Sequence, residues 1–196
     1  MFENKNNYQI TLSHRLMELL IEHEYEEIDS NLIIGKTQKQ SNKNILWMAE
    51  DKIDLLRVYF QFSNNTILTE SYNDFKEDSR ATVNEKLTDI IIRKCEFHQE
   101  KKLSLKKLYN LRFSNFEILF LFASIIGDLS KKALKISGDE SKNFKNKLII
   151  IGLASSYSLI FHKWVYSKNE DISYIMKLAD KYLNNAEELA MNIGLL

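Results

Sequence analysis

Apolar residues recur every three or four positions through most of the chain, and strict alternation over the length of a strand is hard to find. A period of about 3.6 residues is typical of amphipathic α-helices. In the N-terminal third, the pattern predicts helices at residues 8–24, 30–36 and 41–48, and a longer helix from residue 51 to a polar break at 71–80. Ser30 and Ser41 are the expected N-caps of the two short helices, because a serine hydroxyl can accept a hydrogen bond from the first helical amides.

The remainder of the chain predicts a helical body, with helices at residues 82–97, 103–111, 114–136, 144–166 and 171–193. Ser114 followed by Glu117 has the spacing of a capping box, and Gly138 is suited to end the same helix. The segments LFLFASII and LIIIGLASSYSLIF are apolar on nearly every side, so we expect them to be buried from several directions as the core. Together these features predict an all-α fold.

Composition supports the helical interpretation and bears on location. The 196 residues include no proline and only five glycines, so few helix breakers are present. Twenty-seven basic residues balance twenty-seven acidic ones, so only a local patch could attract nucleic acid or an anionic surface.

Cys95 is a single cysteine, which fits a reducing cytoplasm. The longest uncharged runs, 118–127 and 148–161, fall short of the ~20 residues that span a bilayer, so we expect a cytoplasmic protein without a transmembrane segment.

The sequence contains none of the arrangements that usually carry catalysis or bind a metal. The five glycines are isolated, so no glycine-rich phosphate loop exists. The four histidines are scattered, without a pair at helical spacing, so we expect no metal site and no cofactor. Cys95 has His98 one helical turn away and could serve as a nucleophile. A buried small residue beside a surface histidine is the interpretation that we favour, and we expect that the protein is not an enzyme.

One segment has a local positive charge. Between residues 30 and 49 three lysines occur with no acidic residue, and polar residues open the short helix predicted at 41–48. Lysine can bind phosphates and asparagine can pair with adenine edges, so this segment is a candidate DNA-contacting surface. A merely polar surface helix fits the sequence equally well. The candidate DNA-contacting residues are Lys36, Lys39, Ser41, Asn42, Lys43, Asn44 and, at the start of the next helix, Lys52.

Two further groups of residues in the body are candidates for binding. Bulky apolar residues on helices that should face one another could line a pocket for an apolar molecule, and a plain core would have the same composition. These residues are Ile91, Cys95, Phe113, Phe116, Phe120, Phe122 and Tyr157. Small residues in the helix at 144–166 allow close approach of a second copy, and apolar residues form a seam, so we expect a homodimer. The predicted interface includes Gly152, Ser155, Leu159, Ile172, Ile175 and Leu183.

The N-terminal segment resembles the helix-turn-helix of the TetR superfamily. The matching positions are Leu16, Leu19, Leu20, Tyr25, Ser30, Ile34, Ser41, Lys52 and Leu55. Three positions depart from the family pattern. The glycine of the tight turn is missing, Leu46 stands where a tyrosine is usual, and Ala49 stands where a phenylalanine is usual. These departures weaken the prediction of DNA binding in particular.

The body is also similar to this superfamily, and it resembles in particular a TetR-like group found in α-proteobacteria. The positions that match this group are Lys86, Leu87, Asp89, Ile92, Arg93, Lys94, Gln99, Trp164, Asp171, Met176, Asp180, Leu183 and Glu187. The segment 138–157 also resembles the TetR-like, lipid-binding accessory proteins of ubiquinone biosynthesis, through Gly138, Asp139, Ser141, Phe144, Leu153, Ala154 and Tyr157.

The resemblance implies a domain organisation and two alternative functions. A helix-turn-helix domain at residues 1–52 would precede a ligand-binding and dimerisation domain at 53–196. The first function is that of a one-component transcriptional regulator, which binds operator DNA as a dimer and responds to an apolar effector in its helical body. The alternative is a lipid-binding accessory protein of ubiquinone biosynthesis that does not bind DNA.

Overall fold

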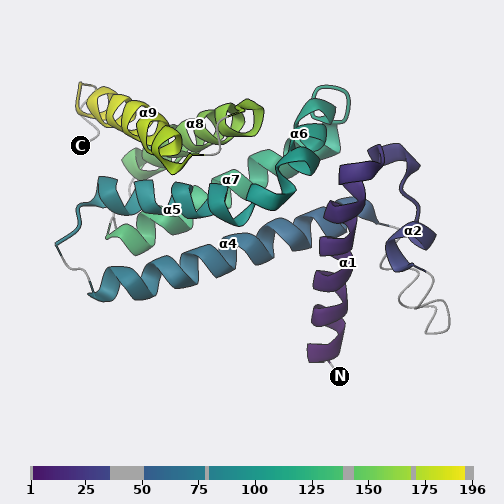
Figure 1. Ribbon diagram of the computed structural model, residues 1–196. Coiled ribbons are helices and arrows are strands. Elements are labelled where there is room, and N and C mark those ends of the chain that lie inside the picture. The colour runs from purple at the N-terminus through teal and green to yellow at the C-terminus, as the bar shows by residue number, and fades with distance from the viewer. Residues whose placement is uncertain (1, 36–50, 78–79, 139–143, 169–170, 193–196) are drawn as a thin grey trace. The chain divides into compact units, whose positions relative to one another are not determined.

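The computed structural model describes residues 2–35, 51–77, 80–138, 144–168 and 171–192 (Figure 1). Within these ranges the secondary structure consists of eight α-helices and two short 3-10 helices, so the predicted all-α fold is confirmed for the described part of the chain. The elements are α1 (Phe2–Glu22), η1 (Tyr25–Glu27), α2 (Ser30–Ile34), α4 (Lys52–Glu77), α5 (Val83–Phe97), η2 (Gln99–Lys101), α6 (Lys102–Leu111), α7 (Phe116–Ser137), α8 (Phe144–Tyr166) and α9 (Ile172–Asn192).

Two helices begin at caps that differ from the expected serines. At α2, the Asp29 carboxylate accepts a 2.8 Å hydrogen bond from the amide of Leu32, so Ser30 lies inside the helix. At α7, the side-chain oxygen of Asn115 accepts hydrogen bonds from the second and third helical amides, in place of Ser114. Asp and Asn cap at least as well as Ser, and here each lies next to the first helical residue. The predicted end of α7 is confirmed, because Gly138 follows it with a φ of 107°.

The polar break predicted at residues 71–80 is wrong, because α4 continues through it to Glu77. The segment contains no glycine or proline that would end a helix. Its polar character reflects the outer side of α4, where Tyr72 is exposed, whereas Leu68 and Ser71 continue the buried side of the helix. Polar composition therefore marked an exposed helical face and not a loop.

The chain divides into two compact units whose membership crosses the expected boundary at residue 52. Unit 1 contains residues 1–62 and 100–122, and unit 2 contains residues 63–99 and 123–196. The helices α4 and α7 therefore each contribute residues to both units. In consequence α6 belongs with the N-terminal helices and not with the body.

Unit 1 is organised around α1, which packs against α2 and α6. Two side chains of α6 bond to carbonyl oxygens of the α1 region. Ser104 Oγ donates to the carbonyl oxygen of Met17 at 2.6 Å, and Lys107 Nζ donates to that of His23 at 3.0 Å. The Lys107 ammonium also lies 3.1 Å from the carboxylate of Glu24. These bonds hold the C-terminal half of α1 to α6.

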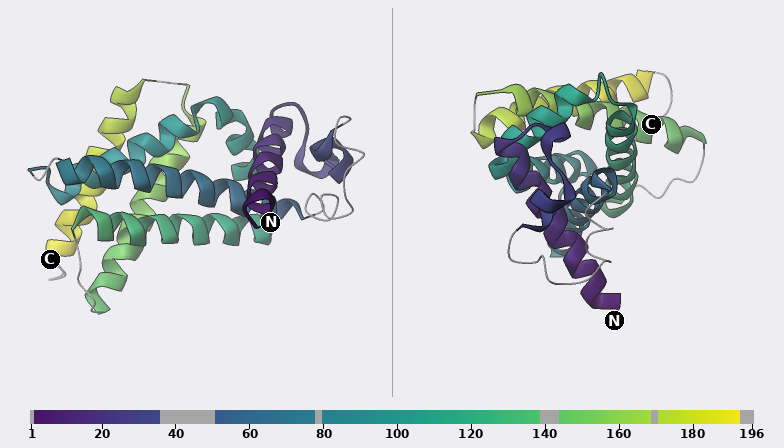
Figure 2. Two further views of the ribbon diagram at one scale, coloured as in Figure 1. Left: turned by 90° about the horizontal axis from the view of Figure 1, so that it is seen from below. Right: turned by 90° about the vertical axis from the view of Figure 1, so that its right-hand side faces the viewer.

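Unit 2 contains a layer of three mutually packed helices, in which α8 lies beside α9 and α5 contacts both (Figures 1 and 2). Asn84 on α5 donates to the side chains of Asn184 and Glu187 on α9, at 2.7 and 2.9 Å. Ser156 Oγ on α8 lies 3.3 Å from the carbonyl oxygen of Tyr182 on α9, which it can reach as a donor. The layer therefore combines apolar packing with specific polar contacts.

The helix α8 includes the stretch Asn146–Tyr166, which is long and apolar enough to cross a membrane by length and composition alone. This stretch is longer than the uncharged run recognised in the sequence, because isolated polar residues interrupt its ends. A core helix has the same composition. In the structure Leu153, Tyr157, Ile160 and Phe161 of α8 are buried.

Candidate functional site

A lysine ammonium lies in the interior of unit 2. One side of α5 is buried throughout, and its members follow the three- and four-residue spacing of a core-facing helix. They are Leu87, Ile90, Ile91, Lys94 and Cys95, followed by His98 at the C-cap. Lys94 is only 1% exposed. A buried charge is costly unless polar groups surround it, so this lysine is chemically the most distinctive point of the unit.

Polar groups from α4 and from the C-terminal end of α5 surround Lys94, and α7 holds the α4 group in place. Its Nζ donates a 2.7 Å hydrogen bond to Asn64 Oδ1 on α4 and lies 3.4 Å from Nε2 of His98. Asn64 is itself buried, and its Nδ2 donates to the carbonyl oxygen of Ile125 on α7 at 3.3 Å. That second bond turns the amide oxygen of Asn64 toward the ammonium. The Lys94 cluster, defined as Lys94, Asn64 and His98, is therefore a preorganised polar site in an apolar interior.

Aromatic side chains of α8 lie beside the Lys94 cluster. The Phe161 ring is centred 5.6 Å from Lys94 Nζ and 5.8 Å from the His98 ring, and the Trp164 ring lies 5.1 Å beyond it. Burial in these surroundings lowers the pKa of Lys94 to about 7, because the charged form loses its hydration. The amine can therefore gain or lose its proton near neutral pH.

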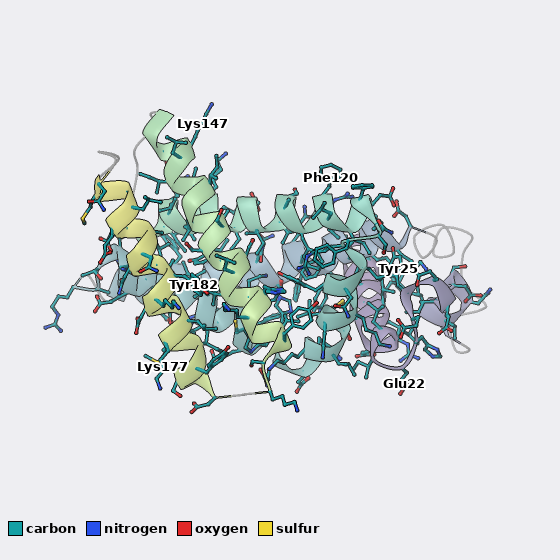
Figure 3. All side chains as sticks on the ribbon, turned by 90° about the horizontal axis from the view of Figure 1, so that it is seen from above. Glu22, Tyr25, Phe120, Lys147, Lys177 and Tyr182 are labelled. Atoms are coloured by element: carbon teal, nitrogen blue, oxygen red, sulfur yellow. The ribbon has the colours of Figure 1, made fainter. Side chains whose placement is uncertain are left out.

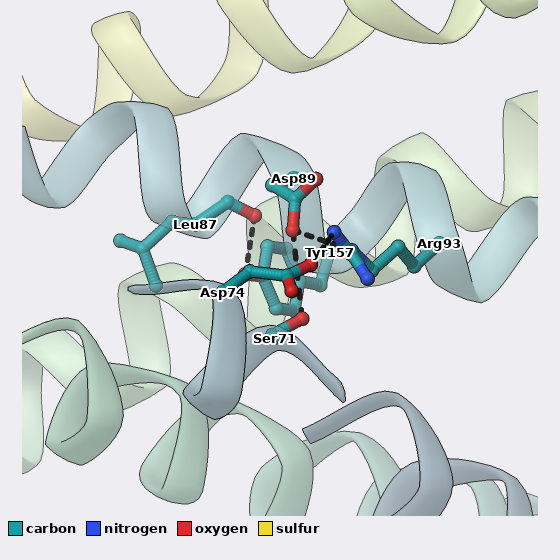
Figure 4. Close-up of polar contacts among 6 residues, drawn as sticks. All are labelled: Ser71, Asp74, Leu87, Asp89, Arg93 and Tyr157. Atoms are coloured by element: carbon teal, nitrogen blue, oxygen red, sulfur yellow. Dashed lines mark hydrogen bonds and ion pairs between the residues drawn. The ribbon is translucent and has the colours of Figure 1, made fainter. Parts of the chain in front are cut away.

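A second polar network joins α4 to α5 on the neighbouring side of α5 (Figure 4). Arg93 lies 2.6 Å from Asp89 through Nε and 2.6 Å from Asp74 through Nη2. Ser71 Oγ on α4 lies 3.5 Å from the same Asp89 oxygen. Because Arg93 directly precedes Lys94, this network fixes the rotation of α5 that directs Lys94 toward Asn64.

Tyr157 connects α8 to α5. Its phenolic Oη donates a 2.7 Å hydrogen bond to the carbonyl oxygen of Leu87, and the residue is completely buried (Figure 4). Burial and the nearby Asp89 carboxylate raise the pKa of Tyr157 well above its ordinary value. Tyr157 is therefore a neutral donor that holds the two helices together.

Lys52 links the start of α4 to the rest of unit 1. Its Nζ donates hydrogen bonds to the carbonyl oxygens of Tyr25 and Ile28, the latter at 2.9 Å, and lies 4.2 Å from the centre of the Tyr25 ring. Burial lowers the pKa of Lys52 and raises that of Tyr25 to about 12, where Glu117, Asp51 and Glu26 also contribute. Lys52 thus fastens the first residue of α4 to the connection between α1 and α2.

The candidate DNA-contacting residues divide into two groups. The Lys52 ammonium points into unit 1 and donates to two carbonyl oxygens there, so it helps to position α4. Its contact with a DNA phosphate stays a prediction. The others lie outside the described residues, and they are Lys36, Lys39, Ser41, Asn42, Lys43 and Asn44.

The candidate pocket residues belong to both units and differ in burial. Ile91, Cys95 and Tyr157 are buried in unit 2. Phe122 is buried in unit 1, where its ring lies 4.6 Å from that of Tyr109. The remaining three phenylalanines are exposed, namely Phe113, Phe116 and Phe120, at 80, 73 and 69%.

The exposure of Phe120 corrects the expectation that the segment LFLFASII is buried from several directions. Ile118, Leu121 and Phe122 form the buried side of α7, whereas Phe120 projects from its outer side (Figure 3). Residues one position apart on a helix are separated by about 100°, so an apolar run cannot turn every side chain to the same core. A second apolar face therefore remains at the surface.

The predicted dimer interface also divides between surface and core. Ser155, Leu159 and Ile172 are exposed and Gly152 is half-buried, so these residues are accessible to a partner. Ile175 and Leu183 are buried within the chain itself, on the side of α9 that faces its own unit, and are not surface residues of the seam.

The residues that sequence reasoning missed were Lys94, Asn64 and, as a buried group, His98. The surface position expected for His98 is wrong, because its side chain has no exposed area. A signal was present in the sequence. Lys94 and His98 stand four residues apart on the apolar stripe of α5, and Ser63 and Asn64 stand on the apolar stripe of α4. Polar residues at core positions mark candidate sites when they occur on facing helices.

In the described part of the chain, no group of three or more His, Cys, Asp or Glu residues is placed to hold a metal ion. No family model, curated protein or solved structure matches this chain.

Proposed function

We propose that this chain is a dimeric one-component regulator of the TetR type, in which unit 2 binds an amphipathic anion at Lys94 and α4 passes the binding event to the N-terminal unit. The observation that carries the proposal is that α4 is attached by hydrogen bonds at two of its residues, Lys52 and Asn64. Lys52, its first residue, bonds to the connection between α1 and α2, and Asn64, about three turns later, accepts a hydrogen bond from Lys94.

The chemistry of the Lys94 cluster supports an anionic head group as ligand. The ammonium and the imidazole of His98 can both donate to a carboxylate or phosphate, and charge-assisted bonds of this kind are strong. Phe161 and Trp164 supply apolar surface next to these donors. Such a combination favours a molecule with a charged head and a long apolar tail over a small polar one.

The Lys94–Asn64 bond supports a mechanism of response. An anion at Lys94 would compete with Asn64 Oδ1 for the ammonium hydrogens, and so would weaken the bond that joins α5 to α4. An effector can shift a conformational equilibrium only if it binds the two states unequally, and this competition supplies the difference. With 26 residues and no glycine or proline, α4 is stiff enough to transmit the change.

The test is an anisotropy titration of DNA from upstream of the protein's own gene, at physiological salt, with oleate below its micellar concentration. We expect sequence-specific binding below micromolar, weakened about tenfold or more by oleate but not by uncharged methyl oleate. The variant Lys94→Met should bind DNA normally and ignore oleate, while Lys163→Met, a change of an exposed lysine on α8, should respond like the native protein. Absence of sequence-specific binding, or an undiminished response of Lys94→Met, would refute the proposal.

The second candidate function is a lipid-binding accessory protein that does not act on DNA. The exposed side chains of Phe113, Phe116 and Phe120 favour it, since large exposed apolar groups suit a lipid surface or protein partner better than a phosphate backbone. Oleate binding that depends on Lys94, in a protein without sequence-specific DNA affinity, would select this candidate.

A further inference from the structure

Four exposed apolar side chains gather at the turn between α6 and α7. This phenylalanine cluster consists of Phe113, Phe116, Leu119 and Phe120. Its three aromatic side chains are 69–80% exposed within eight residues of sequence. Soluble proteins seldom expose apolar groups in such a concentration unless they bind something.

The fold of unit 1 does not require the phenylalanine cluster. The buried side of α7 is already formed by Ile118, Leu121 and Phe122, and the Phe122 ring contacts Tyr109 and Phe60. The cluster residues on α7 are spaced by three and four positions, so they form one continuous face opposite that core. They are available to a partner without any loss of internal packing.

The surrounding sequence is strongly basic. Residues 101–122 contain five basic side chains and one acidic side chain, Glu117, although the whole chain has no net charge. Two of the lysines pair within unit 1, Lys101 with Glu18 and Lys107 with Glu24. Arg112 lies over the ring of Phe113, at 4.3 Å, so a guanidinium accompanies the most exposed aromatic ring.

We propose that the phenylalanine cluster inserts into the interface of an anionic phospholipid bilayer, with the adjoining lysines and Arg112 at the level of the phosphate groups. Aromatic side chains flanked by basic residues have this preference, because rings bury their apolar faces while cations meet negative head groups. A second copy of the chain is a poorer occupant, since pairing two such turns would bring two basic segments together. This inference does not depend on the proposed function.

The experiment is flotation of the whole 196-residue chain with vesicles of phosphatidylcholine alone or with phosphatidylglycerol added as the anionic lipid. We expect binding to the anionic vesicles, about tenfold weaker binding to the neutral ones, and a loss of about tenfold or more in the double variant Phe116→Ser/Phe120→Ser. Leu189→Ser, which changes an equally apolar and 61% exposed side chain of α9, is the matched control and should bind normally. Lys102→Glu/Lys106→Glu should remove the preference for anionic vesicles.

Circular dichroism and thermal unfolding establish that each variant is folded. Equal flotation of native protein and double variant would overturn the proposal. The proposal would also be overturned if the protein does not float and uses Phe116 and Phe120 to self-associate or to bind an acidic protein. Because the readout involves neither DNA nor Lys94, its failure leaves the regulator proposal standing, and the reverse also holds.

Discussion

Lys94 on α5 donates a 2.7 Å hydrogen bond to the side-chain oxygen of Asn64 on α4, and both residues are buried. The bond links two helices at a point where apolar side chains would have packed at a lower cost in free energy. Its presence ties the stability of unit 2 to the protonation of one amine.

The first prediction concerns the pH dependence of stability. The pKa of Lys94 is about 7 in the folded chain, and an unfolded lysine has a pKa of 10.5. Between these values the unfolded chain binds more protons, so the lysine contribution to the free energy of unfolding rises with pH across this window and is constant below it. Relative to Lys94→Met, the native protein should gain up to about 4 kcal/mol from pH 6 to pH 10, at about 1.4 kcal/mol per pKa unit.

Urea unfolding of the two proteins at several pH values measures this difference. Lys163→Met, which alters an exposed lysine of α8, should keep the native slope. The Lys94→Met variant keeps His98 and Cys95, which adjoin Lys94, so the ammonium is the only charged group removed. Parallel pH profiles for native protein and Lys94→Met would show that Lys94 is not titrating in this window.

The second prediction concerns ligand affinity. An anion requires the charged form of Lys94, which is fully populated only below a pH of about 7. Affinity for oleate should therefore be constant below that pH and fall by about tenfold per unit above it, until the pKa of the complex is reached. Calorimetry in buffers of different ionisation enthalpy should detect proton uptake on binding at pH 8. Affinity that is level from pH 7 to 9 would contradict an anion at Lys94.

The third prediction concerns the attachment of α4 in unit 1. Lys52→Met removes the donor that holds the carbonyl oxygens of Tyr25 and Ile28, at an expected cost of about 1–2 kcal/mol for a half-buried, charged donor. Hydrogen exchange should become faster in residues 25–34 before other parts of unit 1 change. Arg57→Met, which breaks an exposed pair with Asp54 on the same helix, should leave those amides unaffected.

Helix positions were largely predictable from the sequence because they depend on local periodicity. The bounds of α8 agree with the prediction, those of α5 differ from it by one residue at the start, and those of α9 differ by one residue at each end. The Lys94 cluster was not predictable to the same degree. Lys94 and His98 are one helical turn apart, but Asn64 lies 30 residues from Lys94, so its meeting with them depends on how α4 and α5 pack. The exposure of Phe116 and Phe120 escaped prediction for a related reason, since hydrophobicity alone does not say which side of α7 faces the core.

The fourth prediction concerns the dimer. Ser155 and Leu159 are exposed on one side of α8, together with Ile151, so a partner helix could pack there. Ser155→Glu should place a charge in that contact and yield monomers in light scattering at micromolar concentration. Ser124→Glu makes the same change at an exposed site on α7 and should leave the mass unaltered. A native protein that is already monomeric at this concentration would contradict the predicted dimer.

The placement of α6 in unit 1 has a consequence for biosynthesis. The hydrogen bond from Ser104 to Met17 joins residues 87 positions apart, so α1 has no α6 to pack against when it leaves the ribosome. At about 5–20 residues per second, roughly 4–17 s pass before that partner has been translated. During this interval the apolar side of α1 is a natural target for chaperones, and unit 1 matures only after all of α5 and α6 have been made. A fragment ending near residue 62 would remain in this immature state, and deletion of the body would not release a finished N-terminal unit.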